Sequence, residues 1–127
     1  MPEFKSRDDL RLALVQAPVI RFDTDTNLKN FDRLLQHVSN VDLVLLPEMF
    51  NTGFSMDSAE QAETENGPST RWLLQQAARL QAVVCGTLTI KVGEGDFRNR
   101  LVWARPDGSL EYYDKRHLFR MGGERFC

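Results

Sequence analysis

Val41-Asp-Leu-Val-Leu-Leu-Pro-Glu-Met-Phe50 is the stretch of this sequence that decides the fold. Its apolar run shows no alternation, which is typical of a strand buried on both faces of a parallel sheet covered by helices. Pro47 ends the strand because its nitrogen has no hydrogen to donate to the ladder. Glu48 therefore follows the carboxyl end of a buried strand, at the edge where open α/β sheets place their sites. Taken alone, the segment is equally compatible with an ordinary glutamate that starts a surface loop.

The flanking sequence predicts alternating strands and helices. A first strand is expected at residues 12–18, and a helix from Asp23 or Thr24 to about Val38 carries apolar residues at helical spacing. Gly67 and Pro68 suit the start of a second helix. Three further strands are expected at about residues 82–92, 99–104 and 110–113, with turns at 93–96 and 106–109. The predicted class is α/β, in the order β-α-β-α-β followed by a β-meander.

This order brings a second charged residue to the edge that carries Glu48. Helical crossovers make the first three strands parallel, and two hairpins then return the fifth strand to the same direction. Lys115 follows that fifth strand in the segment Leu110-Glu-Tyr-Tyr-Asp-Lys-Arg-His-Leu-Phe119. We therefore expect Glu48 and Lys115 to lie at the same edge of the sheet.

The composition is that of one globular domain without a charged binding surface. The chain has 127 residues, 42% of them hydrophobic and 27% charged, and a net charge of −2. This charge gives no basic surface for nucleic acid or membrane, and no apolar stretch approaches the length of a transmembrane helix. Residues 1–10 are expected to form a disordered tail. Two cysteines in unlike contexts predict no disulfide framework, so a cytoplasmic location is expected.

Three segments resemble the nitrilase superfamily of carbon–nitrogen hydrolases, and most of all its omega-amidase branch. They are Leu46-Pro-Glu-Met-Phe50, Asn51-Thr-Gly-Phe54 and Tyr113-Asp-Lys-Arg-His-Leu-Phe119, in that order. The resemblance implies that residues 1–127 are the N-terminal part of a single hydrolase domain with an α-β-β-α sandwich. It also implies that both helices lie on one face of the sheet. The other face, which a second sheet covers in the family, would be left open.

The resemblance further implies a site of Glu, Lys and Cys that hydrolyses a small carboxylate-bearing amide. Glu48 and Lys115 take the first two roles, Glu124 matches a second glutamate, and Phe54 would contact substrate. The nucleophilic cysteine is expected beyond residue 127, so these 127 residues alone are predicted to be inactive. Neither a metal nor an organic cofactor is expected, and the complete protein is expected to be a homodimer.

Several alternatives remain open at this stage. Cys85 lies within an apolar run and suits a buried core position, and Cys127 lacks a preceding strand. Glu124 suits a surface loop equally well, and no role is assigned to Arg116, His117 or Arg120. The chain could also be a non-catalytic truncated half, or a binding or folding fragment of such an enzyme. A reading frame that continues into a strand ending in cysteine would favour the hydrolase.

Overall fold

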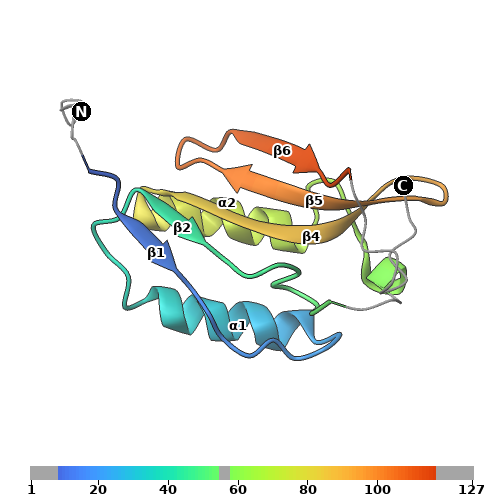
Figure 1. Cartoon of the computed structure of the whole chain (residues 1–127), viewed down its shortest axis with the longest axis horizontal. Helices are drawn as coiled ribbons and strands as arrows, with labels where there is room; N and C mark the ends of the chain where they lie inside the picture. Colours follow the sequence, from blue (N-terminus) through green and yellow to red (C-terminus); the bar gives the residue numbers. More distant parts are fainter. Residues whose placement is uncertain (1–8, 55–57, 117–127) are drawn as a thin grey trace.

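A single sheet organises the computed structural model, which describes residues 9–54 and 58–116. The sheet is six-stranded, with β1, β2, β4, β5 and β6 in that order and β3 paired to β4 outside this path. The strands are β1 Leu12–Leu14, β2 Leu43–Leu45, β3 Glu63–Thr64, β4 Val83–Gly93, β5 Asp96–Ala104 and β6 Leu110–Asp114. β1, β2 and β4 are mutually parallel, whereas β4, β5 and β6 form an antiparallel meander (Figure 1). The predicted strand order and directions are confirmed.

Two helices connect the parallel strands. α1 spans Thr24–Leu35, and the side chain of Asp23 caps it by accepting a hydrogen bond from the Thr26 N–H at 3.2 Å. α2 spans Pro68–Leu80, with Gly67 as its N-cap and Pro68 in its first turn, as predicted. α1 ends three residues before the predicted Val38, because the backbone there closes into turns with N–H groups bonded three residues back.

Three further elements differ from the prediction. β1 stops at Leu14 and does not reach residue 18, since its partner β2 ends at Leu45, just before Pro47. The short 3₁₀ helix η1, Ser58–Gln61, and the two-residue strand β3 were not predicted. Both are too short and too polar to give a periodic signal.

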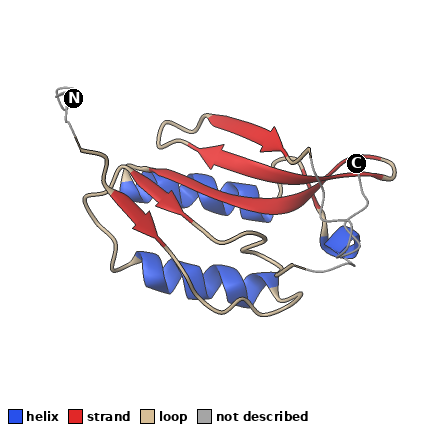
Figure 2. Ribbon diagram, in the orientation of Figure 1, coloured by secondary structure: helices blue, strands red, loops and turns tan. Residues whose placement is uncertain are grey.

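One face of the sheet carries the hydrophobic core. Val44 of β2 pairs with Val84 of β4, which pairs with Ala104 of β5, so the three side chains share a face. Both α1 and α2 cover this face (Figure 2). The core is made of Phe31, Leu35, Val44, Phe50, Leu73, Ala77, Val84, Leu88, Ile90, Val102 and Ala104. The prediction that both helices lie on one face is confirmed.

The opposite face of the sheet is apolar and partly open to solvent. The same register places on it Leu12 and Leu14 of β1, whose exposed fractions are 49% and 70%, and Tyr113 of β6, at 55%. Half-buried side chains lie between them along the sheet: Leu43, Leu45, Val83, Leu101 and Trp103. Neither α1 nor α2 packs against this face, which agrees with the open face that the resemblance implied. Among the described helices, none is long and apolar enough to cross a membrane.

Candidate active site

The loop after β2 carries Glu48 to the carboxyl end of the parallel strands. The last ladder bond runs from the Leu46 N–H to the Cys85 carbonyl at 2.9 Å. Pro47 interrupts the pairing, and the Met49 N–H then donates to Oγ1 of Thr87 on β4 at 2.9 Å. The buried Met49 sulfur accepts a hydrogen bond from Oγ1 of Thr89 at 3.6 Å. Met49, the residue after Glu48, is thus hydrogen-bonded to β4 through both its backbone and its side chain.

Aromatic packing holds the next residue of the loop. The Phe50 ring stacks on Trp72 of α2, with ring centroids 5.8 Å apart, and meets Phe31 of α1 edge-on at 6.2 Å. Gly86 of β4 leaves room for this ring, because a Cβ at that position would lie 2.7 Å from the Phe50 Cδ1. Phe50 therefore points into the core while Glu48 points toward the open face.

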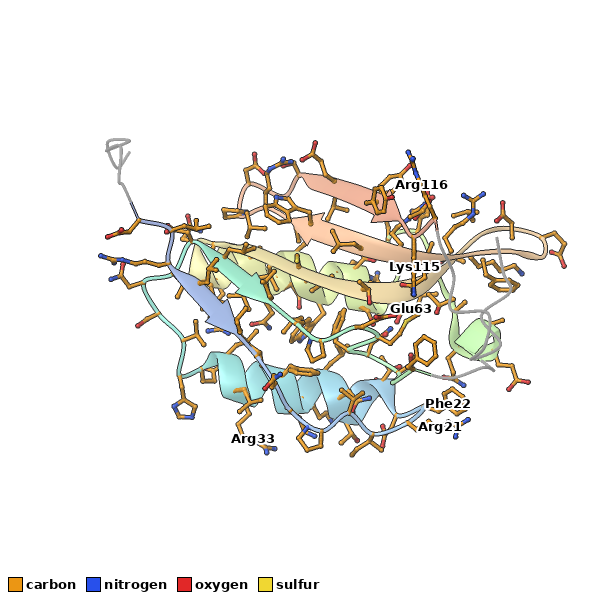
Figure 3. All side chains as sticks on the ribbon, viewed as in Figure 1. Arg21, Phe22, Arg33, Glu63, Lys115 and Arg116 are labelled. Atoms are coloured by element: carbon orange, nitrogen blue, oxygen red, sulfur yellow. The ribbon has the colours of Figure 1, made fainter. Side chains whose placement is uncertain are left out.

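A buried polar network completes the support of the loop. The Asn51 side-chain amide donates to Ser69 Oγ at 3.1 Å and to Glu63 Oε2 at 3.3 Å, and the Asn51 backbone carbonyl accepts from Asn27 Nδ2 at 2.8 Å. Glu63 in turn accepts the Ser69 N–H at 2.7 Å at the start of α2 (Figure 3). The segment Asn51-Thr-Gly-Phe54 is therefore tied to both helices, so it forms a rigid support for Glu48.

Lys115 reaches Glu48 from the end of β6. Its N–H donates to the Asn99 carbonyl of β5 at 2.9 Å, and its Nζ lies 3.7 Å from Glu48 Oε1. Asn99 Nδ2 donates to the same Glu48 oxygen at 3.3 Å. The structure brings Glu48 and Lys115 together as the strand order predicted. Half of the Glu48 side chain is exposed, so solvent screens the pair and its contribution to stability is small.

A small cleft surrounds these groups on the open side of the sheet. Its volume is about 190 Å³, and it is lined by Glu48, Thr87, Asn99, Leu101, Tyr113 and Lys115. The cleft thus combines a carboxylate, an ammonium and a buried amide with apolar walls. A carboxylate can accept and return a proton, and an ammonium can stabilise a developing oxyanion.

The helix-covered face of β5 and β6 carries a charged pair directly behind Lys115. Arg100 is only 7% exposed, and its Nε and Nη2 donate to the two carboxylate oxygens of Asp114 at 2.7 and 3.2 Å. Its Nη1 donates to Glu65 Oε1 at 3.2 Å, and its guanidinium lies 3.8 Å from the centroid of the Tyr112 ring. Burial opposes the charge of Arg100, but the bonds to Asp114 and Glu65 outweigh burial and raise its pKa.

The other residues considered in the sequence analysis do not line the cleft or lie outside the described residues. Phe54 is 43% exposed and is not among the residues that line the cleft. Arg116 is exposed at the end of β6 (Figure 3), with its guanidinium 6.0 Å from the Tyr113 ring. Cys85 is buried, as expected of a core cysteine, and burial raises the pKa of its thiol. Four further residues considered in the sequence analysis lie outside the described residues: His117, Arg120, Glu124 and Cys127.

The sequence analysis predicted only Glu48 and Lys115 among the residues of the cleft; of the four that it missed, Asn99 and Thr87 make hydrogen bonds to Glu48 and to the Met49 backbone. Asn99 was assigned only to the start of a strand, although asparagine is depleted in strands and a buried amide there requires a partner. That depletion was the available signal, but it does not identify Glu48 as the partner. The described residues contain no cluster of three or more histidine, cysteine, aspartate or glutamate side chains that could hold a metal ion.

Comparison with known proteins identifies the family. The model of the carbon–nitrogen hydrolase family matches residues 11–126. The chain belongs to the carbon–nitrogen hydrolase family. Among curated members, it is 43% identical over 117 residues to the omega-amidase YafV of Yersinia enterocolitica. It is 35% identical over 115 residues to YafV of Escherichia coli K12. Both matches cover 91% of this chain and 44% of the relative, so the chain spans less than half the length of these relatives.

Solved structures of carbon–nitrogen hydrolases agree with this fold. A superfamily member from Xanthomonas campestris, described with an arsenic adduct in its active site, superposes with a TM-score of 0.88 at 44% identity. The match covers 93% of this chain and 44% of that one. Nit3 of Saccharomyces cerevisiae, a nitrilase superfamily member, superposes with a TM-score of 0.77 at 23% identity, which supports the fold alone. The α/β class and the resemblance predicted from the sequence are confirmed, and the two matches cover 44% and 48% of those chains.

Proposed function

We propose that the complete protein is an omega-amidase-like hydrolase that cleaves a small carboxylate-bearing amide. The observation that carries this proposal is the contact of Glu48 with Lys115 and Asn99 inside one cleft at the edge of the sheet. The names of the omega-amidase relatives, at 35% and 43% identity, support the substrate class. The nucleophile is proposed to be a cysteine beyond residue 127, and Glu124 is proposed as a second glutamate of the site.

The reaction requires a nucleophile, a proton carrier and a stabiliser of negative charge. In the proposed mechanism Glu48 takes the proton of the cysteine thiol, and the sulfur attacks the amide carbon. The resulting oxyanion is stabilised by the Lys115 ammonium. The carbon–nitrogen bond then breaks as Glu48 returns the proton to the departing ammonia. Water attacks the thioester with Glu48 as base, which releases the carboxylic acid and restores the thiol.

Substrate comparison tests this function directly. The complete gene product should release ammonia from glutaramate and succinamate, and butanamide, which lacks the distal carboxylate, should react roughly 100-fold or more slowly in kcat/KM. The purified 127-residue chain should release none, because it lacks the proposed nucleophile. Equal rates on butanamide would contradict the carboxylate preference. Absence of release from every amide would contradict the hydrolase assignment.

We also propose a location, an oligomeric state and a cofactor requirement for the complete protein. A cytoplasmic location is supported by the lack of a disulfide pattern in the sequence. A homodimer and a mechanism without metal or organic cofactor are supported by the family resemblance.

A further inference from the structure

The position of Lys115 depends on how the end of β6 is held. Lys115 follows Asp114, the last residue of the strand, and one backbone hydrogen bond, from its N–H to the Asn99 carbonyl, continues the ladder there. Strand ends fray when few bonds hold them. A restraint on the preceding residue, Asp114, would also help to hold the Lys115 ammonium beside Glu48.

Arg100 supplies that restraint from the other side of the sheet. Asp114 pairs with Arg100 across β5 and β6, and the two N–H bonds of the guanidinium fix both oxygens of the Asp114 carboxylate. The Asp114 side chain is 21% exposed, so this pair is shielded better than the pair of Lys115 and Glu48. Arg98 lies 3.7 Å from the same carboxylate, but its closer bonds go to Asp96.

Because side chains alternate between the two faces of a strand, holding Asp114 on one face also determines the face to which Lys115 points. Successive side chains of a strand point to opposite faces, so an Asp114 held on the helix-covered face directs Lys115 to the open face, where Glu48 lies. We propose that Arg100 is a positioning residue for Lys115 and acts through the Asp114 carboxylate. This inference rests on the proposed function of Lys115.

The proposal predicts that loss of Arg100 affects substrate turnover and substrate binding differently. Arg100 is not among the residues that line the cleft, so its loss should leave substrate binding largely intact. A displaced ammonium would stabilise the oxyanion less, and an error of about 1 Å can lower a rate by roughly 100-fold. We therefore expect a fall in kcat with little change in KM.

The test uses the complete gene product and variants matched on the same strands. Arg100→Met and Asp114→Asn should each lower kcat by roughly 10- to 100-fold. The double variant should be no slower than the slower single one, because both changes break the same contact. Glu65→Ala removes the other partner of the same guanidinium, and Arg105→Met removes the Arg105–Glu111 pair at the far end of the same hairpin. Both controls should keep kcat within about two-fold of the unaltered protein.

Lys115→Ala separates failure of this proposal from failure of the proposed function. If Lys115→Ala is inactive while Arg100→Met keeps the full kcat, Arg100 does not position Lys115. A rise in KM at constant kcat, or a double variant whose loss is the product of the single losses, would also overturn the proposal. If Lys115→Ala keeps full activity, the proposed role of Lys115 is wrong.

A second readout does not depend on turnover. With lysines labelled by ¹³C at Cε, the Lys115 resonance is identified by its loss in Lys115→Arg. We expect its chemical shift to move toward that of exposed lysines in Arg100→Met and to remain unchanged in Arg105→Met. An unchanged resonance in Arg100→Met would contradict the proposal. Arg100→Lys keeps the buried charge but cannot make both bonds, so it should show the same shift even if Arg100→Met does not fold.

Discussion

Cys85 illustrates how position decides what a reactive side chain can do. It pairs with Leu45 of β2 and Trp103 of β5 in the middle of the sheet and is 4% exposed. Burial raises the pKa of its thiol above the ordinary value of 9.0, so the reactive thiolate is scarce at neutral pH. A cysteine in this environment is a packing residue rather than the nucleophile that the proposed reaction requires.

Alkylation measures the reactivity of the Cys85 thiol. At about pH 8, Cys85 in the folded complete protein should react with iodoacetamide far more slowly than in the same protein unfolded by denaturant. Its rate should rise only above the pH at which an ordinary thiol ionises, because burial disfavours the thiolate. Peptide mapping by mass spectrometry reports the rate for Cys85 separately. Equal rates of Cys85 labelling in folded and unfolded protein would contradict its assignment as a buried packing residue.

Single residues of the site differ in how well the sequence predicts them. Glu48 and Lys115 could be predicted because each follows a strand whose direction the connections determine. The surrounding contacts were not predicted. The contact of Asn99 with Glu48 and that of Arg100 with Asp114 both depend on strand register. Register in a hairpin follows from the turn type and loop length, and the sequence analysis predicted only approximate bounds for these turns and strands.

At the scale of elements, contacts with β4 and with both helices hold residues 46–51 of the loop after β2. The Leu46 and Met49 N–H groups both bond to β4, and Phe50 then enters the core, so Glu48 lies between two residues that the sheet holds in place. The sequence predicted β2, Pro47 and the following turn, but it gave no sign of β3 or η1 beside them. The position of this loop depends on contacts with helices far away in sequence, which a local sequence pattern does not predict.

Gly86→Ala tests whether packing under this loop supports the site. The added Cβ would lie 2.7 Å from the Phe50 ring, so either the ring or the strand must move. We expect a loss of about 1–3 kcal/mol in the free energy of unfolding, together with reduced kcat in the complete protein. Gly93→Ala is the matched control, because the nearest atom to its Cβ lies 3.9 Å away. Denaturant unfolding that shows equal stability for the two variants would contradict the packing argument.

For the whole molecule, the sheet divides the chain into a helix-covered side and an open side. The core lies between the sheet and the helices, whereas the cleft with Glu48 and Lys115 opens on the uncovered side. An apolar sheet face of this kind is typical of a surface that another layer covers. The chain spans 44% of the curated relatives, and the remainder of such a domain is where we place the proposed nucleophile. The two halves of the proposed site would then meet at this face.

The most direct test of this account is ammonia release by the complete gene product carrying Glu48→Gln. The amide keeps the size of the side chain but cannot carry the proton, so kcat on glutaramate should fall by about 100-fold or more. Thermal unfolding should be unchanged, because Glu48 is half exposed. Glu94→Gln, in the exposed turn between β4 and β5, controls for the loss of one negative charge and should keep full activity. Turnover by Glu48→Gln within a few-fold of the unaltered protein would remove Glu48 from the mechanism and contradict the central claim.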